Sequence, residues 1–347
     1  MINVGIAGIG FMGMIHYLAY QKLKGVKVAA ICEQDRTRLG GDWRTIKGNF
    51  GPAGTKMDLS GVERYERLDD MLDNPKLDMI DICLPPAAHA SVAIAALKAG
   101  KHVFCEKPIA LTPADAKRMV KTASSAGKQL MIGQVLPFFP EYAFAYEAAT
   151  SGKYGKLLGG HFKRVISDPQ WLKDFYDPQK VGGPMLDLHV HDAHYIRLLW
   201  GMPRAVFSSG RMRGEVAEYF TSQFIFPDSR LVVSAMSGVI QQQGRGFCAG
   251  FEIHLERATL LYDFAVIDGK AEANMPLTVL TADGKVQRPK MKSSDPVDSF
   301  ASELTEAVAT VRSGKPSPLL DGELARDAVI LCEKQTASIR TGRLVRV

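Results

Sequence analysis

The segment from Asp187 to His194 concentrates side chains that could transfer protons or bind ligands. It holds three of the eight histidines of the chain, in the order Asp-Leu-His-Val-His-Asp-Ala-His. If the segment is helical, Asp187, His191 and His194 share one face; if it is extended, positions 187, 189 and 191 do. A histidine with a pKa near neutral can accept a hydroxyl proton, and His and Asp are also zinc ligands. On these residues alone, both a general base and a metal site are open.

A glycine-rich turn provides a second group with chemical meaning. It follows an apolar stretch directly and opens an amphipathic helix, with the sequence Gly8-Ile9-Gly10-Phe11-Met12-Gly13. In dinucleotide-binding turns the first glycine permits the tight turn, the second lets the backbone approach a pyrophosphate, and the third allows close helix packing. The helix N-terminus stabilises the phosphate charge. The pattern predicts a dinucleotide site that includes Gly8, Gly10, Phe11, Met12 and Gly13.

Glu33 indicates which dinucleotide is bound. It lies at the end of the next predicted strand, about 20 residues after the turn, where a carboxylate binds the ribose hydroxyls of adenosine. Its negative charge would repel the 2′-phosphate of NADP. The positive charges of Arg36 and Arg38, which lie nearby in the sequence, would instead favour that phosphate. We therefore expect NAD as the cofactor, with NADP as the less favoured alternative.

Further motifs follow in the same order along the whole chain. They are Leu84-Pro85-Pro86 with His89, Gly100-Lys101-His102-Val103-Phe104-Cys105-Glu106-Lys107-Pro108, Gly152-Lys153-Tyr154-Gly155-Lys156-Leu157 and Gly182-Gly183-Pro184-Met185-Leu186-Asp187. With these motifs the chain resembles the Gfo/Idh/MocA family of NAD(P)-dependent oxidoreductases. The resemblance implies a nucleotide-binding domain joined to an open-faced mixed sheet whose free face commonly forms oligomers.

The resemblance also implies roles for individual residues. Lys107 would contact the substrate hydroxyl, because an ammonium group can position and polarise a carbinol oxygen. His191 would accept the hydroxyl proton as hydride leaves carbon, and Asp187 would orient it or bind a neighbouring hydroxyl. The residues expected to contact the cofactor in addition to the turn and Glu33 are Leu84, Pro85, His89, Glu106 and Lys107.

Three positions depart from the family pattern. His189 stands where glycine is usual, His194 where aspartate is frequent, and Pro137 where arginine is common. We expect the two histidines to shape the substrate pocket, although a core histidine is the alternative for His189. Other expected substrate contacts, which could equally be ordinary sheet residues, are Lys163, Arg164 and Trp171. No metal is predicted.

The elements that would position these residues fall into two patterns. Up to residue 136, short apolar runs near 2–7, 26–32, 78–84, 102–105 and 129–135 alternate with helical stretches such as 113–126. This alternation is typical of a parallel sheet. We therefore expect an α/β protein whose N-terminal Rossmann domain, a doubly wound parallel sheet, spans residues 1–136.

Beyond residue 150 the apolar pattern has a period of two. Strands are expected near 157–167, 205–213, 219–226, 230–239, 251–264 and 278–288, followed by helices near 296–312 and 322–340 that Asp295 and Asp321 could cap. These elements predict a C-terminal α+β domain over 137–347, with an open-faced and mostly antiparallel sheet for substrate binding and oligomerisation. The stretch 39–61 shows little periodicity and is expected to be a long loop.

Composition narrows the class of partner. The net charge of +6 on 347 residues comes without basic runs, which argues against nucleic acid. No window approaches the roughly 20 apolar residues of a membrane span, and the start of the sequence lacks the features of a signal peptide. Five cysteines form no CxxC pair. We expect a cytoplasmic homodimer or homotetramer that binds a small carbohydrate or polyol.

The expected activity is hydride transfer between NAD and a secondary hydroxyl, or the matching ketone, of a sugar, cyclitol or glycoside. One alternative is an NAD-dependent glycosidase or lyase that oxidises a sugar carbon only transiently. Another is a dinucleotide-binding sensor without turnover. The motifs do not separate the first two, because both use the same cofactor and proton-transfer groups.

Overall fold

The computed structural model describes residues 1–48, 50–291 and 295–347. The chain forms two compact units. The first contains residues 1–110 and 114–138 with the described residues from 295 to 326, and the second contains residues 111–113, 139–291 and 327–347. Within the described ranges, no helix combines the length and the apolar character that crossing a membrane requires.

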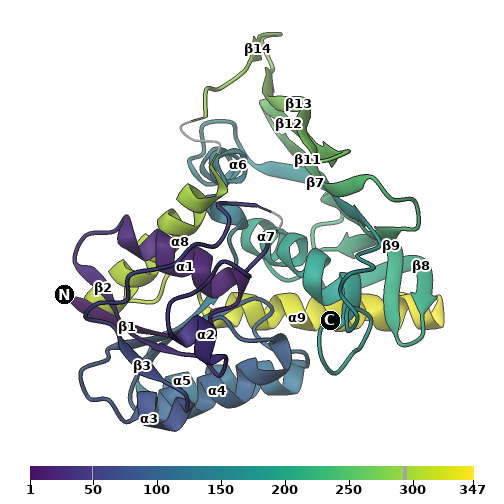
Figure 1. The fold of residues 1–347 in the computed structure, drawn as a ribbon. Coiled ribbons are helices and arrows are strands. Elements are labelled where there is room, and N and C mark those ends of the chain that lie inside the picture. The colour runs from purple at the N-terminus through teal and green to yellow at the C-terminus, as the bar shows by residue number, and fades with distance from the viewer. Residues whose placement is uncertain (49, 292–294) are drawn as a thin grey trace. The chain divides into compact units, whose positions relative to one another are not determined.

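A parallel sheet of six strands forms the centre of the first unit (Figure 1). Its order is β3-β2-β1-β4-β5-β6, with bounds Glu63–Tyr65, Val26–Cys32, Ile2–Ala7, Met79–Ile82, His102–Glu106 and Leu130–Gly133. This is the strand order of doubly wound dinucleotide folds, in which ligands bind beyond the carboxyl ends of the strands where the order reverses. The reversal lies between β1 and β4. The predicted Rossmann sheet is confirmed.

Helices flank this sheet and set its loops. They are α1 (Phe11–Gln21), α2 (Arg36–Leu39), α3 (Leu68–Leu72), α4 (Pro86–Lys98), α5 (Pro113–Ala126) and α8 (Pro296–Ser313), with a 3-10 turn η1 at Leu136–Phe138. Both α4 and α5 begin with proline, whose fixed φ suits the first helical position. All four residues of β4 are buried, as expected for a strand covered on both faces.

Helix α8 belongs to the first unit although it comes from the C-terminal part of the chain. It packs on α1, where the Lys22 ammonium lies 2.7 Å from the Asp298 carboxylate and the Arg312 guanidinium donates a 2.5 Å hydrogen bond to the Gly25 carbonyl. The expected single boundary after residue 136 therefore differs from the structure. The amphipathic pattern of a helix shows that one face is buried, but it does not show which unit buries it.

The stretch 39–61 is an irregular segment that packs onto α1. Its Trp43 is fully buried, with the ring 5.0 Å from that of Tyr17. Phe50 stacks on Phe300 at 5.5 Å and contacts Phe11 edge to face at 4.8 Å. The expected long loop is thus confirmed, and its buried side chains Trp43, Ile46 and Leu59 form part of the hydrophobic core of the first unit; Asn49 lies outside the described residues.

A mixed sheet of nine strands dominates the second unit. Its order is β14-β13-β12-β11-β7-β10-β9-β8-β15, and the pair β7–β10 is parallel whereas the other pairs are antiparallel. The bounds are β7 Leu157–Ser167, β8 Ala205–Arg213, β9 Val216–Ile225, β10 Val232–Ile240, β11 Arg245–Leu255, β12 Ala258–Ile267, β13 Lys270–Thr281, β14 Val286–Gln287 and β15 Val345–Arg346. The predicted mostly antiparallel sheet is confirmed. The single strand expected over 251–264 is instead parts of two strands joined at Glu256 and Arg257.

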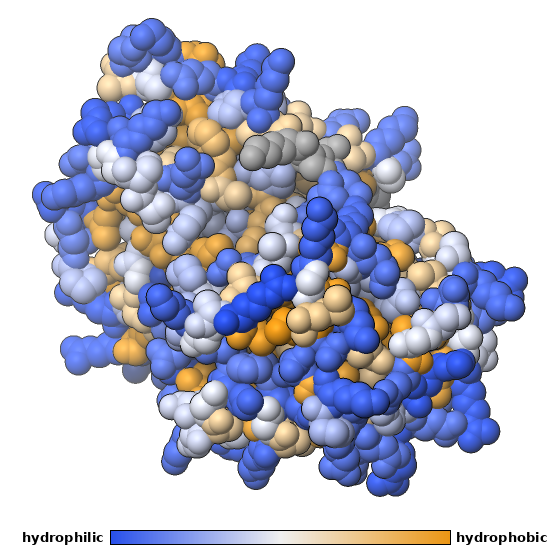
Figure 2. Space-filling model, turned by 90° about the vertical axis from the view of Figure 1, so that its left-hand side faces the viewer, coloured by the Kyte–Doolittle hydropathy of each residue, from blue (hydrophilic) through white to orange (hydrophobic). Residues whose placement is uncertain are grey.

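The helices of the second unit are α6 (Pro140–Thr150), α7 (Val190–Trp200) and most of α9 (Gly322–Thr341), with a π-helical turn η2 at Met185–His189. Helix α7 and turn η2 pack on strands β7, β9 and β10. On the face that Figure 2 shows, hydrophilic residues predominate and hydrophobic residues lie in smaller groups among them.

Candidate active site

The glycine turn between β1 and α1 has the backbone that a pyrophosphate site requires. Gly8 has φ of +93°, which favours glycine, and its N–H donates a 2.9 Å hydrogen bond to the Cys32 carbonyl. A Cβ on Gly13 would lie 2.0 Å from the Gly8 carbonyl oxygen, so the helix can approach the turn this closely only without a side chain. A Cβ on Gly10, by contrast, would meet no atom within 4 Å. The open space at Gly10, before the N-terminus of α1, fits a phosphate group.

Glu33 follows β2 and faces this turn. One carboxylate oxygen accepts a 2.8 Å hydrogen bond from the Ile9 N–H, and the other accepts one of 2.9 Å from the Asp35 N–H. Each carboxylate oxygen has two acceptor sites, so further hydroxyl donors can still bind. Glu33 is therefore both fixed to the turn and chemically able to bind a ribose.

The two nearby arginines have partners within the same unit. Arg36 forms an ion pair of 3.1 Å with Glu66, and the Arg38 guanidinium lies 3.8 Å from the Asp35 carboxylate. These pairs reduce the positive charge available to a 2′-phosphate, which agrees with NAD as the cofactor.

His89, in the second predicted cofactor motif, is a buried link between two chain segments. Its Nε2 lies 2.8 Å from the Leu84 carbonyl oxygen and its Nδ1 2.8 Å from the Pro108 carbonyl oxygen. Burial lowers the pKa of this imidazole. His89 thus ties the loop after β4, which contains Pro85, to the segment after β5.

Lys107 stands directly after β5, at the same carboxyl edge of the sheet as the glycine turn. Its backbone N–H donates a 3.1 Å hydrogen bond to the Glu106 carboxylate, and the Lys107–Pro108 peptide bond is cis. Glu106 is buried, with 6% of its surface exposed. The structure therefore places Lys107 and the glycine turn, from one unit, at the edge where doubly wound sheets bind dinucleotides.

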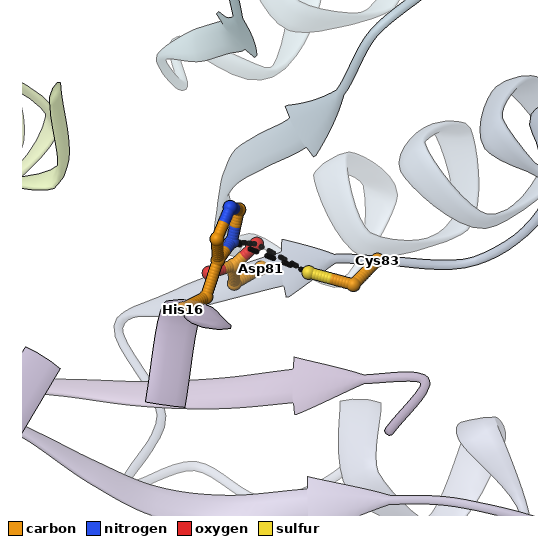
Figure 3. A group of neighbouring side chains, drawn as sticks. All are labelled: His16, Asp81 and Cys83. Carbon is orange, nitrogen blue, oxygen red and sulfur yellow. Dashed lines mark hydrogen bonds and ion pairs between the residues drawn. The ribbon is translucent and has the colours of Figure 1, made fainter. Parts of the chain in front are cut away.

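Sequence reasoning missed a buried group beneath this edge. His16 on α1 and Asp81 on β4 point toward each other, and Cys83 lies just beyond β4 (Figure 3). The ligand atoms of these three residues lie within 4.8 Å of one another, which makes them the one cluster of metal-ligand spacing found among the described residues. The sequence did contain one indication of this group, the charged Asp81 within an otherwise apolar predicted strand. A charged residue in a strand covered on both faces needs a buried partner.

In the second unit, Asp187 and His191 lie on either side of the junction between a π-helical turn and a regular α-helix. Asp187 is within the π-helical turn η2, and His191 is in the first turn of α7. A π turn accommodates one extra residue, and such turns frequently occur at functional sites. The segment is helical throughout, so the extended alternative, in which residues 187, 189 and 191 share a face, does not apply, and the shared face of residues 187, 191 and 194 stays a prediction.

The other two histidines of the segment are core residues of the second unit. His189 is fully buried, with its Nε2 2.8 Å from the Gln335 amide nitrogen and its ring edge to face with Phe220 at 5.1 Å. Burial lowers the pKa of His189 to about 4 and that of His194, which is also fully buried, to about 3. The alternative of core histidines fits these surroundings better than the predicted contact with substrate.

The remaining predicted substrate residues do not gather at one place. Arg164 is buried and bonded to Asp192 of α7, whereas Lys163 precedes it on β7 and so faces the opposite side of the sheet, where it pairs with Asp263 at 2.6 Å. Trp171 lies in the segment after β7 and is 79% exposed. Of these three, only Trp171 offers a largely exposed surface.

The fold and the glycine turn define an NAD-binding oxidoreductase of the Rossmann type. Comparison with known proteins gives the family, through a match to the "Oxidoreductase family, NAD-binding Rossmann fold" over residues 2–134 and to the "GFO/IDH/MocA C-terminal domain" over residues 142–261. The chain belongs to the GFO/IDH/MocA family of oxidoreductases. The expected family, fold class, enzyme class and NAD cofactor are confirmed.

Individual relatives agree with this assignment. The chain is 25% identical over 359 residues to a myo-inositol 2-dehydrogenase of Thermotoga maritima, covering 100% of this chain and 98% of the relative. It is 30% identical over 182 residues to an inositol 2-dehydrogenase of Salmonella typhimurium, covering 52% of this chain and 50% of the relative. Levoglucosan dehydrogenase in complex with NADH and levoglucosan has the same fold, with a TM-score of 0.79, 19% identity, and coverage of 100% and 99%.

Proposed function

We propose that this chain is a dehydrogenase that oxidises a secondary hydroxyl of a sugar, cyclitol or glycoside, or reduces the matching ketone, with NAD. The observation that carries the proposal is the position of Lys107 at the same sheet edge as the glycine turn, both within the first unit. The relatives named inositol 2-dehydrogenase and levoglucosan dehydrogenase support the class of substrate.

Bound NAD would supply the hydride acceptor for the carbon that bears the hydroxyl. The ammonium group of Lys107 would hold and polarise the hydroxyl oxygen, which favours loss of its proton. His191 would accept that proton, because an imidazole can exchange protons near neutral pH. Asp187 would orient His191 or bind a neighbouring hydroxyl. The side chains thus move one proton while a hydride leaves the same carbinol.

The experiment is a screen of polyols, sugars and glycosides for NADH formation by the purified chain, with product analysis. Net NADH supports a dehydrogenase, whereas cleavage of a glycoside without NADH indicates the glycosidase or lyase chemistry. Lys107→Met and His191→Ala should each lower kcat by about 10²- to 10⁴-fold, the usual contribution of a proton-transfer group, while NAD binding persists. The matched controls are Lys98→Met and His161→Ala, at exposed positions. A kcat of Lys107→Met equal to that of the unaltered chain would contradict the proposal.

We also propose that the chain forms a homodimer or homotetramer through its second unit. One face of the nine-stranded sheet exposes large apolar side chains, including Phe207 and Val232 at 39% and 73%. Exposed apolar surface of this kind commonly marks a contact with another chain. Light scattering after size-exclusion chromatography gives the molar mass, and a monomer at micromolar concentration would contradict this proposal.

A further inference from the structure

The buried group beneath the sheet edge in the first unit is centred on His16. Its Nδ1 lies 3.0 Å from an Asp81 carboxylate oxygen, and its Nε2 lies 3.1 Å from the Glu106 Oε1. His16 and Asp81 are fully buried. Among the described residues, only Nδ1 has hydrogen-bond partners, whereas Nε2 and Glu106 Oε1 lie at ion-pair distance without hydrogen-bond geometry, so the two carboxylates favour the protonated ring through their charge.

The groups around His16 come from four elements. They are Tyr20 on its own helix α1, Asp81 and Cys83 in and after β4, Glu106 on β5 and Glu303 on α8. Burial opposes the charged form of His16, but the charges and hydrogen bonds of Asp81 and Cys83 together outweigh it, and the pKa of His16 is raised well above its usual value. The imidazole thus lies between the carboxyl groups of Asp81 and Glu106, and the negative charge beside it favours its protonated form.

The network continues from Glu106 to the lysine. Glu106 faces His16 with Oε1 and accepts the Lys107 backbone N–H with Oε2, at 3.1 Å. Gly133, opposite Glu106 on β6, leaves the room for this arrangement, since a Cβ there would lie 3.1 Å from Oε1. The Glu106 carboxylate is thus held by an ion pair with His16 on one side and by a hydrogen bond from the Lys107 backbone on the other.

A second histidine holds the other side of the lysine. The Nδ1 of His89 lies 2.8 Å from the carbonyl oxygen of Pro108, the residue that follows Lys107. The backbone on both sides of Lys107 therefore connects to a buried imidazole: His16 through Glu106, and His89 directly. Rates of enzymes depend steeply on such placement, because a displacement of about 1 Å can cost on the order of 10²-fold.

We propose that His16 is a positioning residue for catalysis: it holds Glu106 and thereby fixes the backbone from which Lys107 reaches the substrate. The inference rests on the proposed role of Lys107. It assigns a function to a residue of the glycine-turn helix that does not belong to the turn itself and lies too deep in the unit to contact substrate.

A bound metal ion is the competing account of the same residues, since imidazole, carboxylate and thiol are all zinc ligands. The geometry favours hydrogen bonding, because His16 Nδ1, Asp81 and Cys83 Sγ already lie at mutual hydrogen-bond distances of 3.0 Å to 3.4 Å. Elemental analysis of the purified protein separates the two accounts. A stoichiometric metal that His16→Asn removes would overturn the positioning role.

The decisive variants are His16→Asn and Glu106→Gln in the full-length chain. The Asn amide can still donate to Asp81 but no longer reaches Glu106, and the Gln amide oxygen can still accept from Lys107. Each should lower kcat by about 10-fold to 10²-fold, and for His16→Asn calorimetry should show an NAD Kd within about threefold of the unaltered protein. A substrate deuterated at the reacting carbon should give a larger isotope effect on kcat, since hydride transfer becomes slower.

A double-mutant cycle then distinguishes positioning from a general structural defect. If His16 acts through Lys107, His16→Asn should lower kcat far less in a Lys107→Met background than in the unaltered protein. The control His102→Asn changes a half-buried histidine of the same unit whose partner is a backbone N–H, and it should retain kcat. The inference is overturned if the effects of His16→Asn and Lys107→Met on the activation free energy are additive. It is also overturned if His102→Asn lowers kcat as much as His16→Asn does.

The outcomes also separate this inference from the proposed function. If Lys107→Met is inactive and His16→Asn turns over normally, only the positioning role fails. If Lys107→Met retains full turnover, both the proposed function and the positioning role of His16 fail. Should His16→Asn not fold, Glu106→Gln and His16→Gln are judged by the same kcat, isotope-effect and cycle criteria.

Discussion

Arg164 donates two hydrogen bonds of 2.9 Å to the two carboxylate oxygens of Asp192, within the second unit. Both side chains are buried, at 3% and 0% exposure. Burial opposes the charge of Arg164, but its interactions with Asp192 and Tyr142 together outweigh burial and raise the pKa of the guanidinium. The bond joins β7 to α7, the helix that carries His191. A residue that we expected to bind substrate therefore links the sheet to the helix instead.

Asp192→Asn should destabilise the chain by about 3–5 kcal/mol, because it leaves the buried Arg164 charge without its counter-charge. Chemical denaturation followed by circular dichroism gives the change in unfolding free energy. The control is Asp228→Asn, which breaks an exposed pair with Arg230 and should leave stability unchanged. Equal effects of the two substitutions would contradict a role for the buried pair.

Gly10→Ala and Gly13→Ala should have different effects on the same turn. Gly10 has φ of −86° and open space around its Cβ position, so alanine is accepted by the free protein but occupies the space expected for phosphate. NAD affinity should fall by roughly tenfold or more, about 1.4 kcal/mol, at an unchanged Tm. Gly13→Ala places a Cβ 2.0 Å from the Gly8 carbonyl oxygen and should lower Tm even without NAD. Calorimetric titration measures the affinity for NAD, and thermal melts measure Tm. The same Tm for both variants would contradict the separate roles of Gly10 in phosphate binding and Gly13 in helix packing.

His16 should remain protonated on both ring nitrogens at pH 8, because Asp81 raises its pKa against the effect of burial. A group with a raised pKa in the folded state contributes stability that is full below the unfolded pKa of about 6.5 and is lost as pH rises through the folded value. The stability difference between the unaltered chain and His16→Asn should therefore be largest near pH 6 and shrink at alkaline pH. Nitrogen-15 spectra of labelled histidine report the protonation directly, and a neutral ring at pH 7 would contradict this prediction.

Glu303→Met should stabilise the protein at neutral pH. Both carboxyl oxygens of Glu303 are buried without a hydrogen-bond partner among the described residues, and burial together with the charge of Glu106 raises its pKa well above the usual value. The unfolded chain ionises this group above about pH 4.5 whereas the folded chain does not, so the native glutamate costs stability as pH rises. The gain, roughly 1–3 kcal/mol, should vanish below pH 4. Urea unfolding at pH 7 and pH 4 tests this, and Glu306→Met is a less buried control on the same helix.

The sequence predicted the elements that have strong local patterns. Strands β1 and β2 and helix α5 have the expected bounds because apolar runs and the proline and glycine at helix ends are local features. Strand β3 was missed, since its three residues are mostly exposed. The turn at Glu256 and Arg257 was missed because it contains none of the residues, such as glycine or asparagine, that mark tight turns.

The site was predictable to the extent that its motifs are contiguous. The glycine turn, Glu33 and Lys107 lie in short patterns with known spacing. His16 could not be predicted, because its partner Asp81 is 65 positions away and an isolated histidine on an amphipathic helix suggests only a core position. The burial of His189 and His194 likewise depends on packing within the second unit, which local spacing does not reveal.

The packing of α8 on α1 has a consequence for synthesis on the ribosome. Since α8 spans Pro296–Ser313, the nascent nucleotide-binding unit lacks one of its helices until residue 313 has emerged. During that interval Phe300 cannot cover Phe50 and His16, whose rings it contacts in the finished protein. Nascent chains released near residue 136 should therefore expose this apolar surface and recruit chaperones, although they already contain every strand of the parallel sheet.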